Sequence, residues 1–218
     1  MSKVSSDPSP PDRSRAPAGL TYERVLASAM EVLDEEGLDG LSLRRVADRL
    51  GVRVNTVAWH VKDKARLLRA MSDDLLRDCV REALPPDPDE RIFTLIARFR
   101  QGLLSRRDGG RLWVEGRALP WPNHLVFGEA LTGALLETGR GPRDTAWATW
   151  TLVYFTSGLV QEQQSPADGT PGAPVDNSSY PALALTEPYL GDSSFDARFT
   201  YGLTLILNGN PGAATGNT

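Results

Sequence analysis

Residues 43–64 of this 218-residue chain read LRRVADRLGVRVNTVAWHVKDK. From Leu43 to Leu50 the apolar residues follow the i, i+3, i+4, i+7 spacing of one helix face. Ser42 can cap this helix through its hydroxyl group, and Gly51 can end it in a left-handed conformation. The stretch therefore predicts a short helix that stops at a tight turn.

A second short helix follows the turn, with Val57 and Val61 as its inward face. This arrangement is typical of a helix-turn-helix, whose second helix enters the DNA major groove. An ordinary helical hairpin with a solvated charged face has the same periodicity, so spacing alone leaves both interpretations open. Arginine suits guanine or phosphate, asparagine suits adenine, and small side chains suit the thymine methyl group. The candidate DNA-binding residues are Arg44, Arg53, Asn55, Thr56, Ala58, Trp59, His60, Lys62 and Lys64.

The charge distribution supports the DNA-binding interpretation. The whole chain has a formal net charge of −4. Residues 43–70 nevertheless carry eight basic and two acidic side chains, which gives +6 there and −10 elsewhere. A basic region within an acidic chain favours contact with phosphates at one place. A solvated basic helix face would explain part of this pattern.

Residues 21–76 resemble the DNA-binding domain of the Tet repressor (TetR) family. That family shows the pattern T-x-x-W/Y-H/Y-V/F-x-x-K-x-x-L, and this chain has Thr56, Trp59, His60, Val61, Lys64 and Leu67 at those positions. Ala58 departs from the aromatic residue usual in the family, so one phosphate contact through a tyrosine hydroxyl is missing. The resemblance implies a homodimeric regulator that binds a palindromic operator in double-stranded DNA.

The rest of the chain shows helical periodicity without an alternating strand pattern, so we expect an all-α fold. An N-terminal three-helix domain (20–66) should precede a C-terminal ligand-binding and dimerisation domain (67–210). We expect a disordered arm at 1–19, in which Arg13 and Arg15 could reach a minor groove or have no role, and a flexible tail at 211–218. Further helices are expected at 64–83, 90–105, 122–138, 143–163 and 195–207, with a long loop at 165–194 that holds a short helix near 180–187.

Residues 103–120, 154–165 and 195–209 resemble the C-terminal domain of the tetracycline-binding members of the same family. By that resemblance a ligand pocket is lined by Val80, Leu95, Phe99, Leu103, Trp113, Arg117, Trp147, Trp150, Thr151, Tyr154 and Glu162. Plain core packing is the alternative for each aromatic residue, and a surface position at a helix end is the alternative for Glu162. The helices at 143–163 and 195–207 would pair with their mates in a homodimer.

The same resemblance predicts a changed ligand. A histidine and a glutamate bind a magnesium–tetracycline chelate in those relatives; the glutamate aligns with Glu162 and the histidine with Trp113. Indole cannot bind a hard cation, which prefers oxygen or imidazole ligands. A second histidine and an asparagine align with the apolar Val80 and Leu95. We therefore expect no metal or other cofactor, and a small apolar or aromatic effector such as an antibiotic or other natural product.

Composition excludes several other classes of protein. No apolar run approaches the length of a membrane span, and the N-terminus lacks a signal-peptide core. The single Cys79 cannot form an internal disulfide, which suits the cytoplasm. We expect no enzymatic activity, because His124 stands alone in an expected loop and Asp73 and Asp74 are expected to be solvated. An activator, or a regulator without a ligand, would share every residue of the DNA-binding motif.

Overall fold

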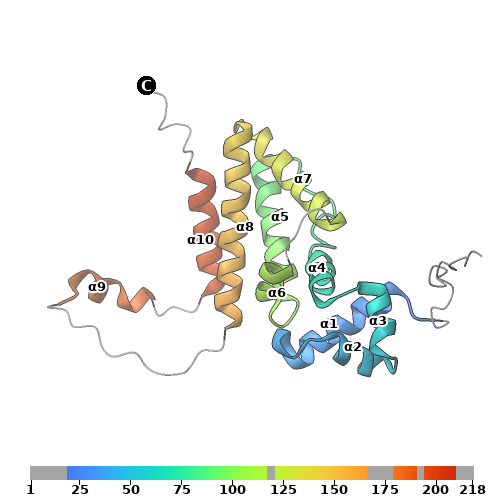
Figure 1. Cartoon of the computed structure of the whole chain (residues 1–218). Coiled ribbons are helices and arrows are strands. Elements are labelled where there is room, and N and C mark those ends of the chain that lie inside the picture. The colour runs from blue at the N-terminus through green and yellow to red at the C-terminus, as the bar shows by residue number, and fades with distance from the viewer. Residues whose placement is uncertain (1–18, 117–120, 166–178, 191–193, 210–218) are drawn as a thin grey trace, which may run out of the picture.

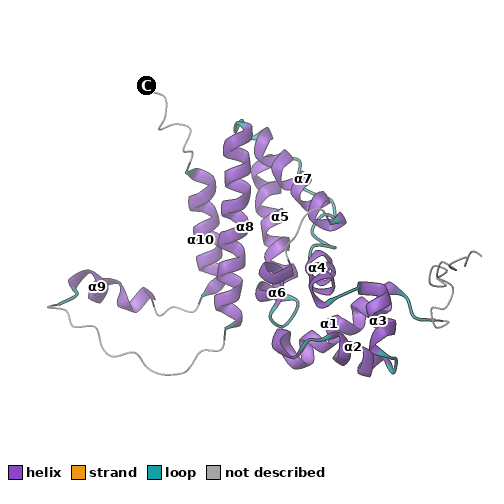
Figure 2. Cartoon of the chain, in the orientation of Figure 1, coloured by secondary structure: helices purple, strands orange, loops and turns teal. Residues whose placement is uncertain are grey.

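A computed structural model describes residues 19–116, 121–165, 179–190 and 194–209. This part of the chain folds into ten helices and contains no strand, which confirms the all-α prediction (Figures 1 and 2). Nearly all of the expected arm and tail, most of the 165–194 loop, and Arg117 lie outside the described residues.

The predicted helix-turn-helix is present. Helices α1 (Tyr22–Gly40), α2 (Leu43–Leu50) and α3 (Val54–Val61) form one packed unit at one end of the molecule (Figure 1). The Ser42 hydroxyl caps α2 by accepting a hydrogen bond from the backbone N–H of Arg45, at 3.2 Å. Gly51 ends α2 with φ at 66°, a left-handed conformation that glycine adopts at little cost. Val46, Ala47, Val57 and Val61 are fully buried between these helices.

Helix α4 (Lys64–Asp74) is shorter than the 64–83 helix that the sequence predicted. After Asp73 the backbone tightens, and residues 75–81 form turns closed by hydrogen bonds between residues three apart. The prediction was wrong because Leu75, Leu76 and Cys79 remain buried on the same side, so the apolar spacing of a helix continues through the turns. Helix α4 also crosses the expected boundary between residues 66 and 67, so the two parts of the chain share one helix.

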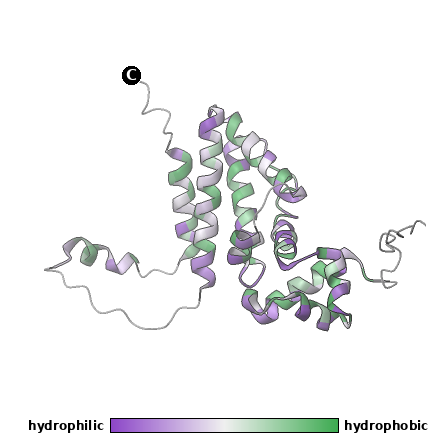
Figure 3. Ribbon diagram, viewed as in Figure 1, coloured by the Kyte–Doolittle hydropathy of each residue, from purple (hydrophilic) through white to green (hydrophobic). Residues whose placement is uncertain are grey.

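Four further helices form the body of the C-terminal part: α5 (Pro88–Leu104), α7 (Pro122–Glu137), α8 (Pro142–Gln164) and α10 (Phe195–Asn208). Helix α5 packs between α7 and α8, and α10 lies along the outer side of α8 (Figure 1). In Figure 3 apolar residues run along α5 and recur on the outer helices α8 and α10. The observed bounds of these four helices agree with the predicted spans to within about two residues.

Two helices complete the fold. The sequence prediction missed α6 (Gly109–Gly116), which packs tightly against α4. Gly116 permits this close approach, since a Cβ atom there would clash with the Leu68 carbonyl oxygen. Helix α9 (Pro181–Leu190) has no buried residue and stands away from the body in Figure 1.

Candidate DNA-binding surface and ligand cavity

The outer face of α3 presents the side chains that the sequence predicted. Arg53, Asn55 and Trp59 are exposed, while Thr56, Ala58 and His60 are half-buried. Arg53, the N-cap residue of α3, makes no side-chain cap, and its carbonyl accepts from the Thr56 N–H at 2.9 Å, so the N–H groups of Val54 and Asn55 are the ones open to an anion. The helix therefore offers polar and aromatic groups outward while its two valines fix it to the core.

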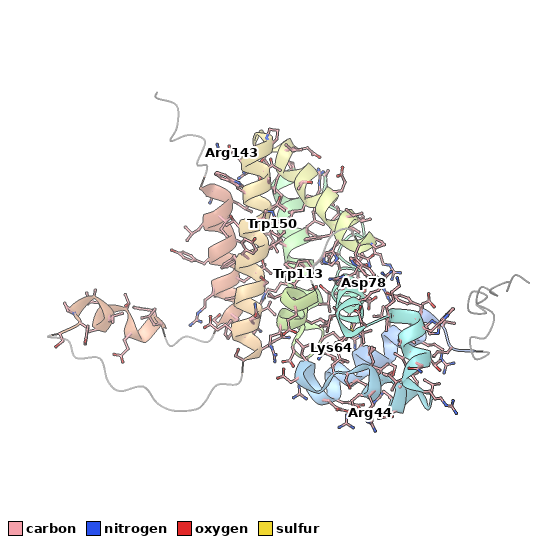
Figure 4. The ribbon with its side chains drawn as sticks, in the orientation of Figure 1. Arg44, Lys64, Asp78, Trp113, Arg143 and Trp150 are labelled. Carbon is pink, nitrogen blue, oxygen red and sulfur yellow. The ribbon has the colours of Figure 1, made fainter. Side chains whose placement is uncertain are left out.

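The basic residues around α3 divide into two groups. Arg45 and Arg49 are engaged with α1: Arg45 lies 3.1 Å from Glu36, and Arg49 bonds Glu31 and Glu35. The other group makes no ion pair with any carboxylate in the described part of the chain and is exposed: Arg44, Arg53, Lys62 and Lys64. Figure 4 shows Arg44 at the outer edge of this unit and Lys64 at the start of α4. The second group is therefore available to phosphates.

The turn from α3 into α4 is strained at Lys62. Its backbone has φ at 65° and ψ at −65°, and the N–H of Asp63 donates to the carbonyl of Val61 at 2.8 Å. These are the features of the uncommon γ-turn with positive φ, which non-glycine residues adopt at a cost. Asp63 then caps α4 by accepting from the N–H of Arg66 at 2.7 Å. This short connection fixes the direction of α4 relative to α3.

An apolar cavity of about 250 Å³ lies in the C-terminal part, between α6, α7 and α8. Trp113 comes from α6 and Trp150 from α8; both are labelled in Figure 4. Phe99 lies behind them, 4.9 Å from Trp113 and 5.4 Å from Phe127 between ring centroids. The remaining lining residues are His124, Phe127, Gly128, Thr132, Ala146, Thr149 and Val153.

His124 is one of the seven lining residues of this cavity that sequence reasoning missed. It lies in the first turn of α7, is 6% exposed, and stacks on Trp113 with ring centroids 4.9 Å apart. The expectation that His124 lies in a loop was wrong, whereas the helix predicted at 122–138 is present and begins at Pro122. The signal that could have placed His124 on the inner face of a helix is Pro122 followed by the i, i+3 spacing of His124 and Phe127.

Asp73 holds His124 in place. Its carboxylate accepts from the His124 backbone N–H at 2.9 Å and lies 2.8 Å from Nδ1 of the same residue. It also accepts from the side-chain amide of Asn123 at 3.0 Å. Trp121, the residue before α7, supplies no side-chain cap, so a carboxylate from α4 caps α7 instead. Asp73 is thus 6% exposed, and the expectation that it is solvated was wrong.

Its neighbour Asp74 also differs from the prediction. The Asp74 side chain is only 17% exposed and pairs with Arg77. Burial raises the pKa of the Asp74 carboxyl, and the charge of Arg77 offsets part of that effect. Two adjacent aspartates suggested a solvated helix exterior, but both side chains face the protein where α4 ends.

The other predicted ligand residues that the structure describes are distributed over four places. Leu95 and Leu103 are fully buried in the α5 core, and Val80 is half-buried in the turns after α4. Trp147 and Thr151 line a separate hollow of about 290 Å³ between α8 and α10.

Tyr154 and Glu162 lie on the outer side of α8. Tyr154 stacks on Trp150 with ring centroids 5.4 Å apart, and both rings are exposed. The Glu162 side chain is 66% exposed and lies 3.7 Å from Arg198. Of the predicted residues, the structure therefore places Trp113 and Trp150 in the cavity lining, with Phe99 packed behind Trp113.

A polar contact joins the C-terminal part to α1 as well. Arg106, just after α5, bonds Asp34 at 2.6 Å, and Arg111 on α6 bonds Asp39 at 2.9 Å. The bond from Arg111 holds the pKa of the Asp39 carboxyl below its usual range. A displacement of α6 therefore acts on both α4 and the C-terminal end of α1.

The described residues contain neither a candidate metal site nor a candidate membrane span. Within those ranges no three His, Cys, Asp or Glu side chains are grouped as metal ligands would be. Over the same ranges no helix has the length and apolar character needed to cross a membrane.

Comparison with known proteins agrees with this arrangement. Residues 25–71 match the family model of bacterial regulatory proteins of the tetR family, and residues 84–210 match that of the tetracyclin repressor-like C-terminal domain. The chain is 33% identical over 196 residues to the tetracycline repressor protein class A from transposon 1721 of Escherichia coli, covering 87% of this chain and 90% of that repressor.

Solved structures show the same similarity. A possible TetR family transcriptional regulator from Streptomyces coelicolor A3(2) is 33% identical with a TM-score of 0.76, over 87% of this chain and 98% of the other. ActR from Streptomyces coelicolor in complex with actinorhodin is 28% identical with a TM-score of 0.78, over 87% and 94%. These relatives are named as a repressor, a possible TetR family transcriptional regulator and a TetR family protein. This chain is therefore a member of the TetR family of bacterial transcriptional regulators.

Proposed function

We propose that this chain is a repressor that binds a palindromic operator as a homodimer and leaves it when a small aromatic effector occupies the cavity. The observation that carries the proposal is the path of α4. Its first residue follows the strained turn after α3, and Asp73 near its end bonds His124 in the cavity wall. A ligand that displaces the wall therefore acts on the helix that orients α3.

The exposed face of α3 supports operator binding. We assign base contacts to Arg53, Asn55 and Thr56, whose groups suit guanine, adenine and thymine. The unpaired Arg44, Lys62 and Lys64, together with the open N-terminus of α3, suit phosphates. The rest of the DNA-binding surface of α3 consists of Ala58, Trp59 and His60, to which we assign apolar contacts and contacts at the edge of the interface. Two such units would read half-sites about 34–36 Å apart.

An exposed apolar face on α8 and α10 supports the homodimer. Trp147 and Tyr154 on α8 are 59% and 54% exposed, and Tyr201 and Leu205 on α10 are 69% and 56% exposed. A contiguous apolar face of this kind marks an interaction surface. Pairing with a second copy would bury this apolar face. It would also cover the outer side of Trp150 and the α8–α10 hollow. Thr151 and Glu162 would then lie near the interface.

Leu205→Glu tests the dimer. A charge in the centre of the face should produce a folded monomer, measured by light scattering after gel filtration and by circular dichroism. Leu125→Glu on α7 is the matched control, because Leu125 is 53% exposed but lies outside the face. A dimer that persists in Leu205→Glu at micromolar concentration would contradict this interface.

The structure of the TetR family protein ActR in complex with actinorhodin supports a small-molecule effector for this chain. The cavity is apolar and, at about 250 Å³, is slightly smaller than the roughly 300–1,000 Å³ of drug-sized pockets. Tryptophan at position 113 makes a magnesium-dependent effector unsuitable, since indole does not bind hard cations. We place the protein in the cytoplasm with the DNA that it regulates.

The decisive test selects DNA from a random pool with the purified full-length protein, then screens compounds for release of that DNA. Asn55→Ala should lose operator discrimination, whereas Arg81→Ala, an exposed arginine in the turns after α4, should not. Trp113→Ala should weaken the response to an effector without changing operator affinity. Unchanged DNA affinity at saturating ligand would refute induction and favour a regulator that no ligand controls. A promoter fusion distinguishes a repressor from an activator.

A further inference from the structure

Two buried nitrogen atoms of the cavity wall lack hydrogen-bond partners. They are Nε1 of Trp113 and Nε2 of His124, and both are shut off from solvent. The two side chains line the cavity and are 4% and 6% exposed. A buried polar atom without a partner costs free energy and is uncommon in native proteins. Trp113 and His124 line the same cavity, but neither nitrogen is itself open to it, so a ligand can complete both nitrogens only after the two rings move apart.

The contact with Asp73 fixes which ring nitrogen of His124 carries the proton when the ring is neutral. The Asp73 carboxylate already accepts from the N–H groups of Asn123 and His124, and an ionised carboxylate can only accept. The Nδ1 atom, 2.8 Å away, must therefore carry a proton. In the neutral ring Nε2 is then an acceptor, whereas Nε1 of an indole is always a donor.

We infer that these two residues select an aromatic effector by a ring hydroxyl group, an inference that rests on the proposed ligand control. A hydroxyl oxygen accepts from the indole N–H of Trp113 and donates its own hydrogen to Nε2 of His124. A carbonyl or ether oxygen satisfies only the indole, and a hydrocarbon satisfies neither. The apolar remainder of the wall, including Phe127 and Val153, takes the rings of the effector.

The geometry also indicates how the effector enters. The rings of Trp113 and His124 stack 4.9 Å apart with an angle of 7° between their planes. Since neither nitrogen is reachable from solvent, the hydroxyl-bearing edge must part this stack to meet them. His124 is bonded to α4 through Asp73, so parting the stack displaces the α4 connection as well.

The test uses naphthalene derivatives of matched size, because a cavity of about 150 Å³ holds benzene and this one is larger. Binding of 2-naphthol, 2-methoxynaphthalene and naphthalene is measured by calorimetry on the full-length protein. We expect 2-naphthol to bind at least about tenfold more tightly than naphthalene, with 2-methoxynaphthalene between them. Equal affinity for the three probes, or no binding of any of them, would overturn the inference.

Two variants assign the preference to residues. His124→Phe keeps the stacked ring but removes Nε2, so the advantage of 2-naphthol over 2-methoxynaphthalene should disappear while naphthalene binding is retained. Thr132→Val is the matched control in the same wall, because its hydroxyl already donates to the Gly128 carbonyl at 2.7 Å. A preference that survives in His124→Phe would overturn the assignment.

The result is separable from the proposed function. If the wild-type protein binds the probes without preferring 2-naphthol, the hydroxyl selection fails while ligand control of operator binding stands. If compounds bind in the cavity with the expected preference but none of them alters operator affinity, the selection stands and the proposed induction fails. The calorimetric and DNA-release measurements therefore give independent answers.

Discussion

Replacing Asp73 by alanine should destabilise the protein strongly, although the substitution removes no apolar contact. The carboxylate accepts from the backbone N–H and Nδ1 of His124 at 2.9 and 2.8 Å, and both residues are 6% exposed. Each hydrogen bond to a charged group contributes about 1.5 kcal/mol or more, and its buried donor is left unpaired. The Asp73→Ala variant should therefore lose about 3 kcal/mol of unfolding free energy.

Urea denaturation followed by tryptophan fluorescence measures the loss as a lower midpoint at an unchanged slope. Asp78→Ala is the control, because the Asp78 side chain is 79% exposed and its partner Arg81 lies on the same surface turn. That variant should change the free energy of unfolding by less than about 0.5 kcal/mol. A loss below about 1 kcal/mol in Asp73→Ala would refute the view that a carboxylate from α4 caps α7.

Three other predictions concern single positions. Lys62→Gly should raise the free energy of unfolding by about 1 kcal/mol, because glycine tolerates positive φ. The same change should lower the salt dependence of DNA binding by about one phosphate contact per subunit, because it removes the Lys62 charge. A loss of stability would contradict the strained turn. Gly116→Ala should cost about 2 kcal/mol or more through its clash with Leu68, whereas Gly133→Ala, which meets nothing within 4 Å, should be neutral or stabilising, as thermal melting will show. Burial raises the pKa of the Cys79 thiol to about 12, so at pH 8 the thiol stays protonated and iodoacetamide should modify the folded protein about a thousandfold more slowly than the unfolded chain; rapid alkylation of the native state would contradict its burial.

The helix-turn-helix shows how much local sequence can predict. Its caps, its left-handed glycine and its buried valines all depend on residues within about ten positions of one another, and each has a recognisable spacing. The candidate base-contacting residues followed from the same stretch. The end of α4 shows the opposite case, because an apolar face at helical spacing continues through residues 75–81 although the backbone there forms turns.

The ligand cavity shows why the remaining site could not be predicted. Resemblance to relatives indicated Trp113 and Trp150, which line the cavity, but it also indicated Trp147, which lies in a different hollow. His124 was missed because its burial depends on Asp73, fifty-one residues earlier in the chain. No periodicity reveals a pairing between residues so far apart.

The sequence by itself determined the helical class, the DNA-binding motif and the concentration of positive charge around it, because these depend on composition and on short-range spacing. Only the tertiary structure decided which of those arginines are free, since Arg45 and Arg49 are neutralised by acidic residues of α1. It also decided that Asp73 and His124 form one buried unit at the cavity wall. Whether a charge is solvated, paired or buried depends on what packs against it, and that is settled only when distant helices meet.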